Sequence, residues 1–395
     1  MFSVAAAIVL CWGLGSLACA VVFLAKLRIP VGEPVAGIVL ILPATGLVDN
    51  LGRLLAALSR QTLRGWRLII AVEASNDPAF GRAAALATAH PELAIDIVVA
   101  GVCDHRGQKC TNILAALSRL TSADRFIVML DADICPQPWW LAALVGPLAA
   151  GRAEVVNGYR WMVPQPPQLA ALLIADIDHR LAVLPRFAPA AMLWGGSLAM
   201  TREALETVDL PSTFERQVVE DMPIADRIAE TGLRLLTRRA LRVPTPLRGS
   251  WRDMWAFGRR QSQFVRIYRP RLWFIAGVMA SAELFARVML VWDLFAAGAM
   301  AALAILACAA TLGSATAELR FAIGRRIGAA DGPSTRVCQH LLVWATLPIE
   351  VFYVGLIWAG AVASPIRWAH VRYALDRSGR VSAARRYPYQ RGREG

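Results

Sequence analysis

The sequence predicts an α/β domain built on a doubly wound, mostly parallel sheet, with one N-terminal and two to three C-terminal membrane helices. Apolar runs alternate with helix-forming segments between residues 35 and 250, a pattern typical of a parallel sheet covered by helices. Long apolar stretches lie on both sides of that region. Of the 395 residues, 56% are hydrophobic and only 18% are charged, which is too apolar for an ordinary soluble protein.

Residues 1–28 are predicted to form a transmembrane anchor. The uncharged run 4–25 is long enough to cross a bilayer. In a secretory signal, basic residues precede the apolar core, whereas here Lys26 and Arg28 follow it. The positive-inside rule therefore places the N-terminus outside and the next domain in the cytoplasm.

The α/β domain is predicted to occupy residues 35–250, and its most informative segment is 126–134, an apolar run that ends in Asp131 and Asp133 and is predicted to form a buried strand. Carboxylates at i and i+2 of an extended segment point the same way. They lie at the strand end where open α/β sheets bind ligands, and they can share a hard cation that holds a diphosphate. The alternative is a strand end capped by solvated acids. Further strands are expected at 36–42, 66–72 and 95–100, and helices at 50–60, 106–119 and 224–231.

Two more candidate positions precede this strand. Glu73 and Asp77 follow the strand 66–72, where they can accept hydrogen bonds from a nucleobase and ribose. Asp77 can equally cap a helix that begins at Pro78, and both roles can coexist. Lys109 lies in the first turn of a predicted helix, where the macrodipole disfavours a cation. A bound anion such as a sugar diphosphate would explain a lysine at this position. The alternative is that Lys109 is an ordinary surface lysine.

The second half of the domain adds a glycine pair and a second acidic pair. Gly195 and Gly196 permit close approach of the backbone to a ligand, or simply a tight turn. Glu220 and Asp221 directly precede a helix. A carboxylate there can serve as a base in an apolar pocket or as a helix cap.

Residues 251–292 are predicted to form amphipathic helices at the membrane interface. Arg260, Gln263 and Phe264 share one helical face in a basic, aromatic stretch. Residues 272–292 carry Glu283 and Arg287, so an interfacial helix suits them at least as well as a spanning one.

Residues 293–364 are predicted to contain membrane-spanning helices, at 294–317 and 338–363, with Arg325 and Arg326 in an outer loop. Glu350 is an ionisable group within the second helix, and it is either functional or faces water or another helix. Residues 365–395 are predicted to form a basic cytoplasmic tail.

The net charge of +13 does not indicate nucleic-acid binding, because no nucleic-acid module or basic motif interleaved with aromatic residues is visible. Basic residues beside membrane helices favour contact with an anionic lipid surface. Seven cysteines without a CxxC pair indicate a reducing compartment and argue against structural zinc. We expect a multi-pass integral membrane protein with a cytoplasmic domain, in a bacterial inner membrane.

The order of these motifs resembles a family 2-type glycosyltransferase with the A fold, and more specifically the ceramide glucosyltransferase branch and its bacterial relatives, some associated with hopanoid lipids. The resemblance extends over nearly the whole chain. The residues that carry it are VEASNDPA (72–79), Gly107/Lys109/Asn112, DAD (131–133), WGGSLAM (194–200), VEDMPIADRI (219–228), RRQSQFVR (259–266) and, weakly, IRWAHVRY (366–373).

The resemblance implies a role for each matching residue. Glu73 and Asp77 would bind uracil and ribose. Asp131 and Asp133 would bind the nucleotide and Mg²⁺ or Mn²⁺, with Lys109 near the diphosphate, and Asp221 would be the general base. The acceptor and the diphosphate would be held by Gly195, Gly196, Ser197, Glu220, Arg260, Gln263 and Phe264.

Two positions depart from the family pattern. Ala74 stands where the branch usually has an aspartate, and the Q-x-x-R-W motif appears as Arg260-Gln-Ser-Gln263-Phe264, or in another register as Gln263-Phe-Val-Arg266-Ile267. We expect an inverting, metal-dependent transfer of a hexose from a UDP-sugar to a lipid hydroxyl of a ceramide-like, diacylglycerol or hopanoid acceptor. The alternatives are a processive polysaccharide synthase and a catalytically lapsed membrane scaffold.

Overall fold

The computed structural model describes residues 2–30, 34–185, 193–297, 300–362 and 365–389. The chain divides into two compact units. The sheet unit contains Arg28–Trp161, Arg186–Pro246 and Ser364–Gly395, and the helical unit contains Met1–Leu27, Met162–Pro185 and Leu247–Ala363.

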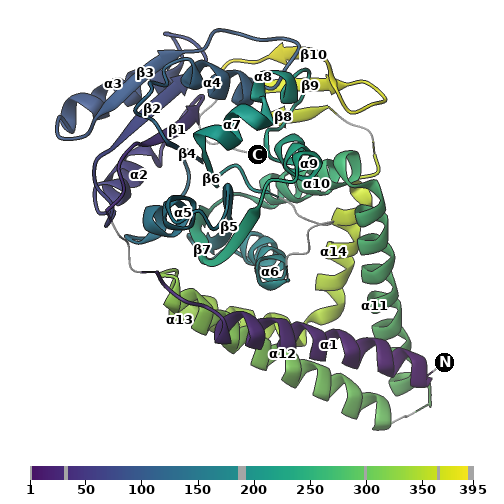
Figure 1. The fold of residues 1–395 in the computed structure, drawn as a ribbon. Coiled ribbons are helices and arrows are strands. Elements are labelled where there is room, and N and C mark those ends of the chain that lie inside the picture. Colours follow the sequence, from purple (N-terminus) through teal and green to yellow (C-terminus); the bar gives the residue numbers. More distant parts are fainter. Residues whose placement is uncertain (1, 31–33, 186–192, 298–299, 363–364, 390–395) are drawn as a thin grey trace. The chain divides into compact units, whose positions relative to one another are not determined.

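The sheet unit is built on a seven-stranded mixed sheet in the described part of the chain, in the order β3-β2-β1-β4-β6-β5-β7 (Figure 1). Neighbouring strands from β3 to β4 are parallel, and β6 runs antiparallel to β4 and β5. The predicted doubly wound, mostly parallel sheet is therefore confirmed. The strands are β1 (Ile38–Ala44), β2 (Trp66–Val72), β3 (Ile95–Val99), β4 (Phe126–Leu130), β5 (Val155–Pro164), β6 (Ser197–Thr201) and β7 (Leu235–Leu247).

Strand β1 lies between β2 and β4, so the chain reverses its direction of travel across the sheet at this point. Such a switch point opens a crevice at the carboxyl ends of the parallel strands, where ligands bind. The predicted acidic motifs follow β2 and β4, and the fold therefore brings them to the same edge of the sheet.

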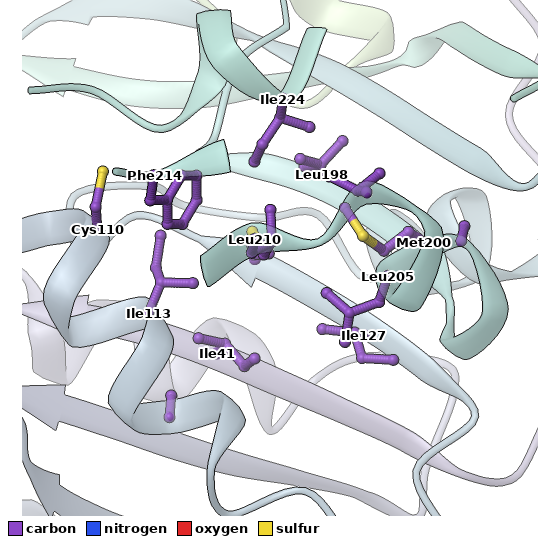
Figure 2. Packing of buried hydrophobic residues seen from close by; sticks show 14 of the residues in the cluster. Ile41, Cys110, Ile113, Ile127, Leu198, Met200, Leu205, Leu210, Phe214 and Ile224 are labelled. Atoms are coloured by element: carbon purple, nitrogen blue, oxygen red, sulfur yellow. The ribbon is translucent and has the colours of Figure 1, made fainter. Parts of the chain in front are cut away.

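The core of the sheet unit explains why these segments fold as they do. Strands β1 and β4 are buried along their whole length, which matches their uninterrupted apolar sequences. Ile41 and Ile127 of these strands pack in one cluster with Phe214 and Ile224 (Figure 2). The helices of the unit are α2 (Leu51–Leu58), α3 (Pro78–Ala89), α4 (Gln108–Leu117), α5 (Trp140–Ala149), α7 (Arg202–Val208), α8 (Leu210–Thr213) and α9 (Asp221–Thr231).

The C-terminal segment folds into a second sheet within the sheet unit, which the interpretation of 365–395 as a basic tail did not foresee. The strands β8 (Ile366–Trp368), β9 (Val371–Leu375) and β10 (Val381–Arg386) are antiparallel, in the order β10-β9-β8. Along β9, Val371 and Tyr373 are buried and Arg372 is exposed. This alternation shows that one face of the sheet is packed; we call β8–β10 the C-terminal sheet.

The helical unit contains the apolar helices. Within the described residues, three helices are long and apolar enough to cross a membrane, or four if a bent pair is taken as one span. The three are α1 (Phe2–Ala25), α11 (Pro270–Ala297) and α12 (Met300–Arg326). Helix α1 packs against α11 and α12, with Val9 beside Ala286 and Ala302.

Two details of the predicted membrane segments were wrong. The expected single helix at 338–363 is two helices, α13 (Pro333–Trp344) and α14 (Thr346–Ala359), bent by 90°. Arg325 and Arg326 form the last turn of α12 rather than part of a loop. The interfacial stretch is divided between α10 (Trp251–Tyr268) and α11, and α11 has the length and hydropathy of a span.

Buried charges within the helical unit pair with one another. Asp176, on α6 (Leu169–Val183), accepts hydrogen bonds from Arg180 Nε at 2.9 Å, Arg320 Nη1 at 2.7 Å and the Tyr353 hydroxyl at 2.7 Å. Arg180 Nη1 also lies 3.6 Å from Glu350 Oε1. Glu350 therefore faces another helix of the unit, one of the alternatives that the sequence left open.

Candidate functional site

The predicted metal motif lies directly beyond the end of β4. The strand stops at Leu130, and Ala132 and Asp133 form a turn, so the argument from an extended segment does not apply to these acids. Asp131 is half-buried and Asp133 is exposed. The edge of the sheet thus presents one carboxylate to the interior of the site and one to solvent.

Lys109 joins the acidic motif after β4 to the acidic pair Glu220 and Asp221. Its Nζ lies 2.6 Å from Asp131 Oδ1 and 2.5 Å from Glu220 Oε1. Burial by itself would lower the pKa of the ammonium, but the two carboxylates raise it above its ordinary value. The alternative of an ordinary surface lysine is therefore excluded. Lys109 is also one of only two lysines in a chain with 42 basic residues, a signal that the sequence offered.

Asp221 is the first residue of α9, next to this bridge. Its Oδ1 accepts a hydrogen bond from Met222 N at 2.8 Å. Burial, followed by repulsion from Glu220, raises the pKa of the Asp221 carboxyl to about 7. A carboxylate with this pKa can accept a proton near neutral pH.

The glycine pair packs directly against the carboxylates. A Cβ on Gly196 would overlap the Trp194 ring and lie 2.5 Å from Asp131 Oδ2, and one on Gly195 would overlap Glu220 Oε1 outright. The close approach that the sequence suggested is therefore to protein carboxylates. Ser197, by contrast, is fully buried in β6, where its hydroxyl accepts a hydrogen bond from Trp140 Nε1 at 2.9 Å.

Gly107 and Asn112 of helix α4 hold the surrounding loops in place. Gly107 N donates a hydrogen bond to Gln217 O at 2.7 Å, and a Cβ on Gly107 would overlap the backbone of Val218. The Asn112 side-chain amide donates to Ala44 O at 3.0 Å and Ala71 O at 3.1 Å, at the ends of β1 and β2. These two residues tie α4, and with it Lys109, to three segments of the site.

Asp77 caps helix α3, as one of the two sequence interpretations proposed. Its Oδ1 accepts hydrogen bonds from Ala79 N at 2.9 Å and from Gly46 N, in the loop after β1, at 2.8 Å. Burial raises the pKa of the Asp77 carboxyl above its ordinary value despite these two bonds. Asp77 therefore fixes the loop that follows β1.

Glu73 is almost fully buried, and two partners from the C-terminal sheet contact it. Arg386 Nε donates to Glu73 Oε1 at 2.5 Å, and His370 Nε2 lies 3.3 Å from Oε2. Burial favours the neutral acid, but the contacts with His370 and Arg386 outweigh it and lower the pKa of the Glu73 carboxyl. Sequence reasoning missed both partners, because they lie some three hundred positions from Glu73; only the weak resemblance at 366–373 pointed to this region.

The residues of the altered Q-x-x-R-W motif lie on α10 in the helical unit. Gln263 is buried, Phe264 is half-buried, and the Arg260 guanidinium lies 5.5 Å from the centre of the Phe257 ring.

The site has the chemistry to hold Mg²⁺ or Mn²⁺ together with a diphosphate. Within the described ranges, no group of three or more His, Cys, Asp or Glu residues could hold a metal by itself. Asp131 and Asp133 supply two carboxylates, and such ions are commonly held by one or two carboxylates plus substrate phosphates. The Lys109 ammonium lies between Asp131 and Glu220, so the carboxylates of Asp131 and Glu220 converge on a cation.

Comparison with known proteins places the chain among glycosyltransferases. The family profile described as Glycosyl transferase family 21 matches residues 3–381. No curated protein matches significantly.

Among solved structures, a mannosyltransferase from Pyrobaculum calidifontis in complex with GDP-Man and Mn²⁺ matches with a TM-score of 0.48 and 16% identity, over 91% of this chain and 98% of that one. The glucosyl-3-phosphoglycerate synthase from Mycobacterium tuberculosis, in complex with Mn²⁺, UDP and glucosyl-3-phosphoglycerate, matches with a TM-score of 0.33 and 18% identity, over 54% and 71%. GalNAc-T7 with UDP, GalNAc and Mn²⁺ matches with a TM-score of 0.42 and 14% identity, over 55% and 45%.

Proposed function

The chain belongs to glycosyl transferase family 21, and on that premise we propose that it transfers a hexose from a UDP-sugar to a membrane lipid hydroxyl, with inversion at C1. The observation that carries the proposal is the cluster at the end of β4. There Lys109 bridges Asp131 and Glu220, and Asp221 directly adjoins the bridge. This cluster combines a cation for the leaving group, carboxylates for a metal and a base for the acceptor.

The leaving diphosphate carries negative charge that the site must stabilise. Mg²⁺ or Mn²⁺ held by Asp131 and Asp133 would neutralise part of this charge when bound. Lys109 supplies a second positive charge from the first turn of α4, whose N-terminal backbone N–H groups also favour an anion. Lys109 would then donate to a diphosphate oxygen in place of one of its present carboxylate partners.

Asp221 accepts the proton of the acceptor hydroxyl in this mechanism. The hydroxyl oxygen attacks C1 of the hexose from the face opposite the diphosphate. The bond from C1 to oxygen forms as the bond from C1 to the diphosphate oxygen breaks, and the electron pair leaves with the UDP. The proton of the acceptor hydroxyl passes to the Asp221 carboxylate, so the new glycosidic oxygen carries no charge. A single displacement of this kind inverts the configuration at C1.

The helical unit supports a lipid acceptor. Three helices with the length and apolar composition of membrane spans belong to the same chain as the cluster. Lys26 and Arg28 follow α1 immediately, which by the positive-inside rule favours a cytoplasmic sheet unit in a bacterial inner membrane. We propose a ceramide-like lipid, diacylglycerol or a hopanoid as the acceptor class.

The test is to incubate the purified protein with native lipid extract, Mn²⁺ and a panel of nucleotide sugars, and to identify products by mass spectrometry. We expect one hexose per lipid, made from a UDP-sugar. Asp221→Asn and Asp133→Ala should abolish turnover, whereas Glu230→Gln, which removes an exposed carboxylate on the same helix as Asp221, should leave it unchanged. Near-normal turnover by either of the first two variants would refute the assignment.

The same experiment separates the alternatives. A ladder of products with increasing sugar number would indicate a processive synthase. A catalytically lapsed scaffold would give no glycolipid with any nucleotide sugar. It would also show no thermal stabilisation by UDP with Mn²⁺, if it has lost nucleotide binding as well, because only a ligand bound to the folded state raises stability.

A further inference from the structure

The C-terminal sheet is firmly docked on the sheet unit. The Tyr373 hydroxyl, fully buried on β9, accepts a hydrogen bond from Gln108 N at 2.9 Å, at the start of α4. Arg216 Nε donates to Val381 O at 3.1 Å, and Val381 N donates to Arg216 O at 2.7 Å. Arg216 Nη2 also pairs with Asp376 at 2.9 Å. Both β9 and β10 are thus anchored independently of Glu73.

Arg386, at the end of β10, is held by the loops around the donor site. Besides its bond to Glu73, Nη2 donates to Cys103 O at 3.0 Å and to Gln108 Oε1 at 2.9 Å, and Nη1 pairs with Asp104. The guanidinium therefore joins the end of β2 to the segment between β3 and α4. Because the guanidinium is planar and rigid, Arg386 loses little conformational freedom for each hydrogen bond that it makes with these protein acceptors.

An aromatic pair lies beside this arginine. The rings of His370 and Tyr389 are 4.2 Å apart between centroids. A Cβ on Gly46 would lie 3.6 Å from the Tyr389 ring, and Gly46 is the residue whose N–H is bonded to Asp77. Tyr389 is only half-buried, and a partly open aromatic ring can stack with any nucleobase.

We propose that the C-terminal sheet forms a wall of the nucleoside half of the donor site, and that Arg386 and His370 fix the position of the Glu73 carboxylate beside it. The inference rests on the proposed function, and it extends it to residues near the C-terminus. The ligand class is the base and ribose of a nucleoside diphosphate, whose diphosphate lies at the Asp131 end. Arg386 and His370 are positioning residues, and Tyr389 is the residue that contacts the base.

The inference is tested first on the unmodified, full-length protein by hydrogen–deuterium exchange with and without saturating UDP and Mn²⁺. We expect slower exchange both in residues 126–134 and in residues 366–389, because ligand binding suppresses local opening. Protection at 126–134 alone would overturn the inference and leave the proposed function standing. Protection at neither segment would overturn both.

The second test compares Arg386→Ala with Arg385→Ala, which removes the neighbouring, exposed arginine of β10. We expect the first variant to weaken UDP binding roughly tenfold or more, since it leaves a buried carboxylate without its partner. The KM for the donor should rise by a similar factor, with kcat at saturating donor within about twofold. The second variant should match the wild type.

A merely structural role for Arg386 would lower the thermal midpoint and kcat without a specific rise in KM, and that result would overturn the inference. Tyr389→Ala provides a variant outside the ion-pair network. It should weaken UDP binding by about 5- to 150-fold, which corresponds to the roughly 1–3 kcal/mol that stacking of one base contributes, while Tyr389→Phe should bind UDP as the wild type does. Equal UDP affinity in Tyr389→Ala and the wild type would contradict the proposed contact with the base.

Discussion

Replacing Lys109 by methionine tests the cation that joins two acidic motifs. The Nζ contacts Asp131 and Glu220 at 2.6 and 2.5 Å, and the Lys109 side chain is only 15% exposed. Breaking a pair this buried by removing one partner costs about 3–5 kcal/mol, because charge is left uncompensated. Methionine fills similar space without charge, so the loss should be electrostatic.

The pH dependence of this loss distinguishes charge from packing. Lys109 lowers the pKa of the Asp221 carboxyl, which stands at about 7 with the lysine present. Without Lys109 we expect that pKa to rise further above its value in the unfolded chain. A raised folded-state pKa penalises the native state at higher pH. The penalty begins to shrink as pH falls below the folded-state pKa, and it is gone only below the pKa of the unfolded chain. The loss of thermal stability in Lys109→Met should therefore be larger well above pH 7 than well below it.

The activity of the variant provides the second measurement. Losing one charged group that stabilises the leaving diphosphate should lower kcat/KM by about 10²–10³. Lipid glycosylation is followed by mass spectrometry, and the thermal midpoint by intrinsic fluorescence. The matched control is Lys26→Met, which changes the only other lysine of the chain. A Lys109→Met enzyme with kcat/KM within about twofold of the wild type, and with a pH-independent stability change, would refute the reasoning.

Three further predictions follow from the same cluster. Gly196→Ala should lower kcat/KM by at least about tenfold, because its Cβ collides with both the Trp194 ring and Asp131. Gly81→Ala, on an open face of α3, should preserve activity, and equal activity of the two variants would contradict this prediction. The wild-type rate should fall as pH decreases through about 7, since Asp221 must be ionised to accept a proton; a rate that stays constant down to about pH 5 would exclude this role. Asn112→Ala should lower the thermal midpoint, because Ala44 O and Ala71 O each lose a buried hydrogen bond worth about 1–3 kcal/mol; an unchanged midpoint would show that these carbonyls find other donors.

Much of the fold follows from local patterns in the sequence. The apolar run before Asp131 predicted a strand within 126–134, and β4 lies there but ends at Leu130. The cap at Asp77 followed from its position before Pro78. These predictions succeed because strand burial and helix capping depend on residues only a few positions apart.

The membrane segments show where local patterns fail. Hydropathy located the apolar stretches, and α1 corresponds to the run 4–25. The predicted span 294–317, however, begins at the end of α11 and continues in α12, which extends to Arg326. Hydropathy did not locate the 90° bend between α13 and α14. The direction of a chain after a break depends on what the two helices pack against, and an average over a window of residues does not contain that information.

The sequence by itself determined which residue types stand at the ends of the strands, the order of the acidic motifs, and the presence of membrane-length helices. Only the tertiary structure decided that Lys109 bridges two of those motifs, that Gly195 and Gly196 pack against carboxylates, and that Arg386 contacts Glu73 across 313 positions. The physical reason is that propensity and periodicity act over a few residues, whereas the pairing of buried charges depends on which distant segments the fold brings within a few ångströms.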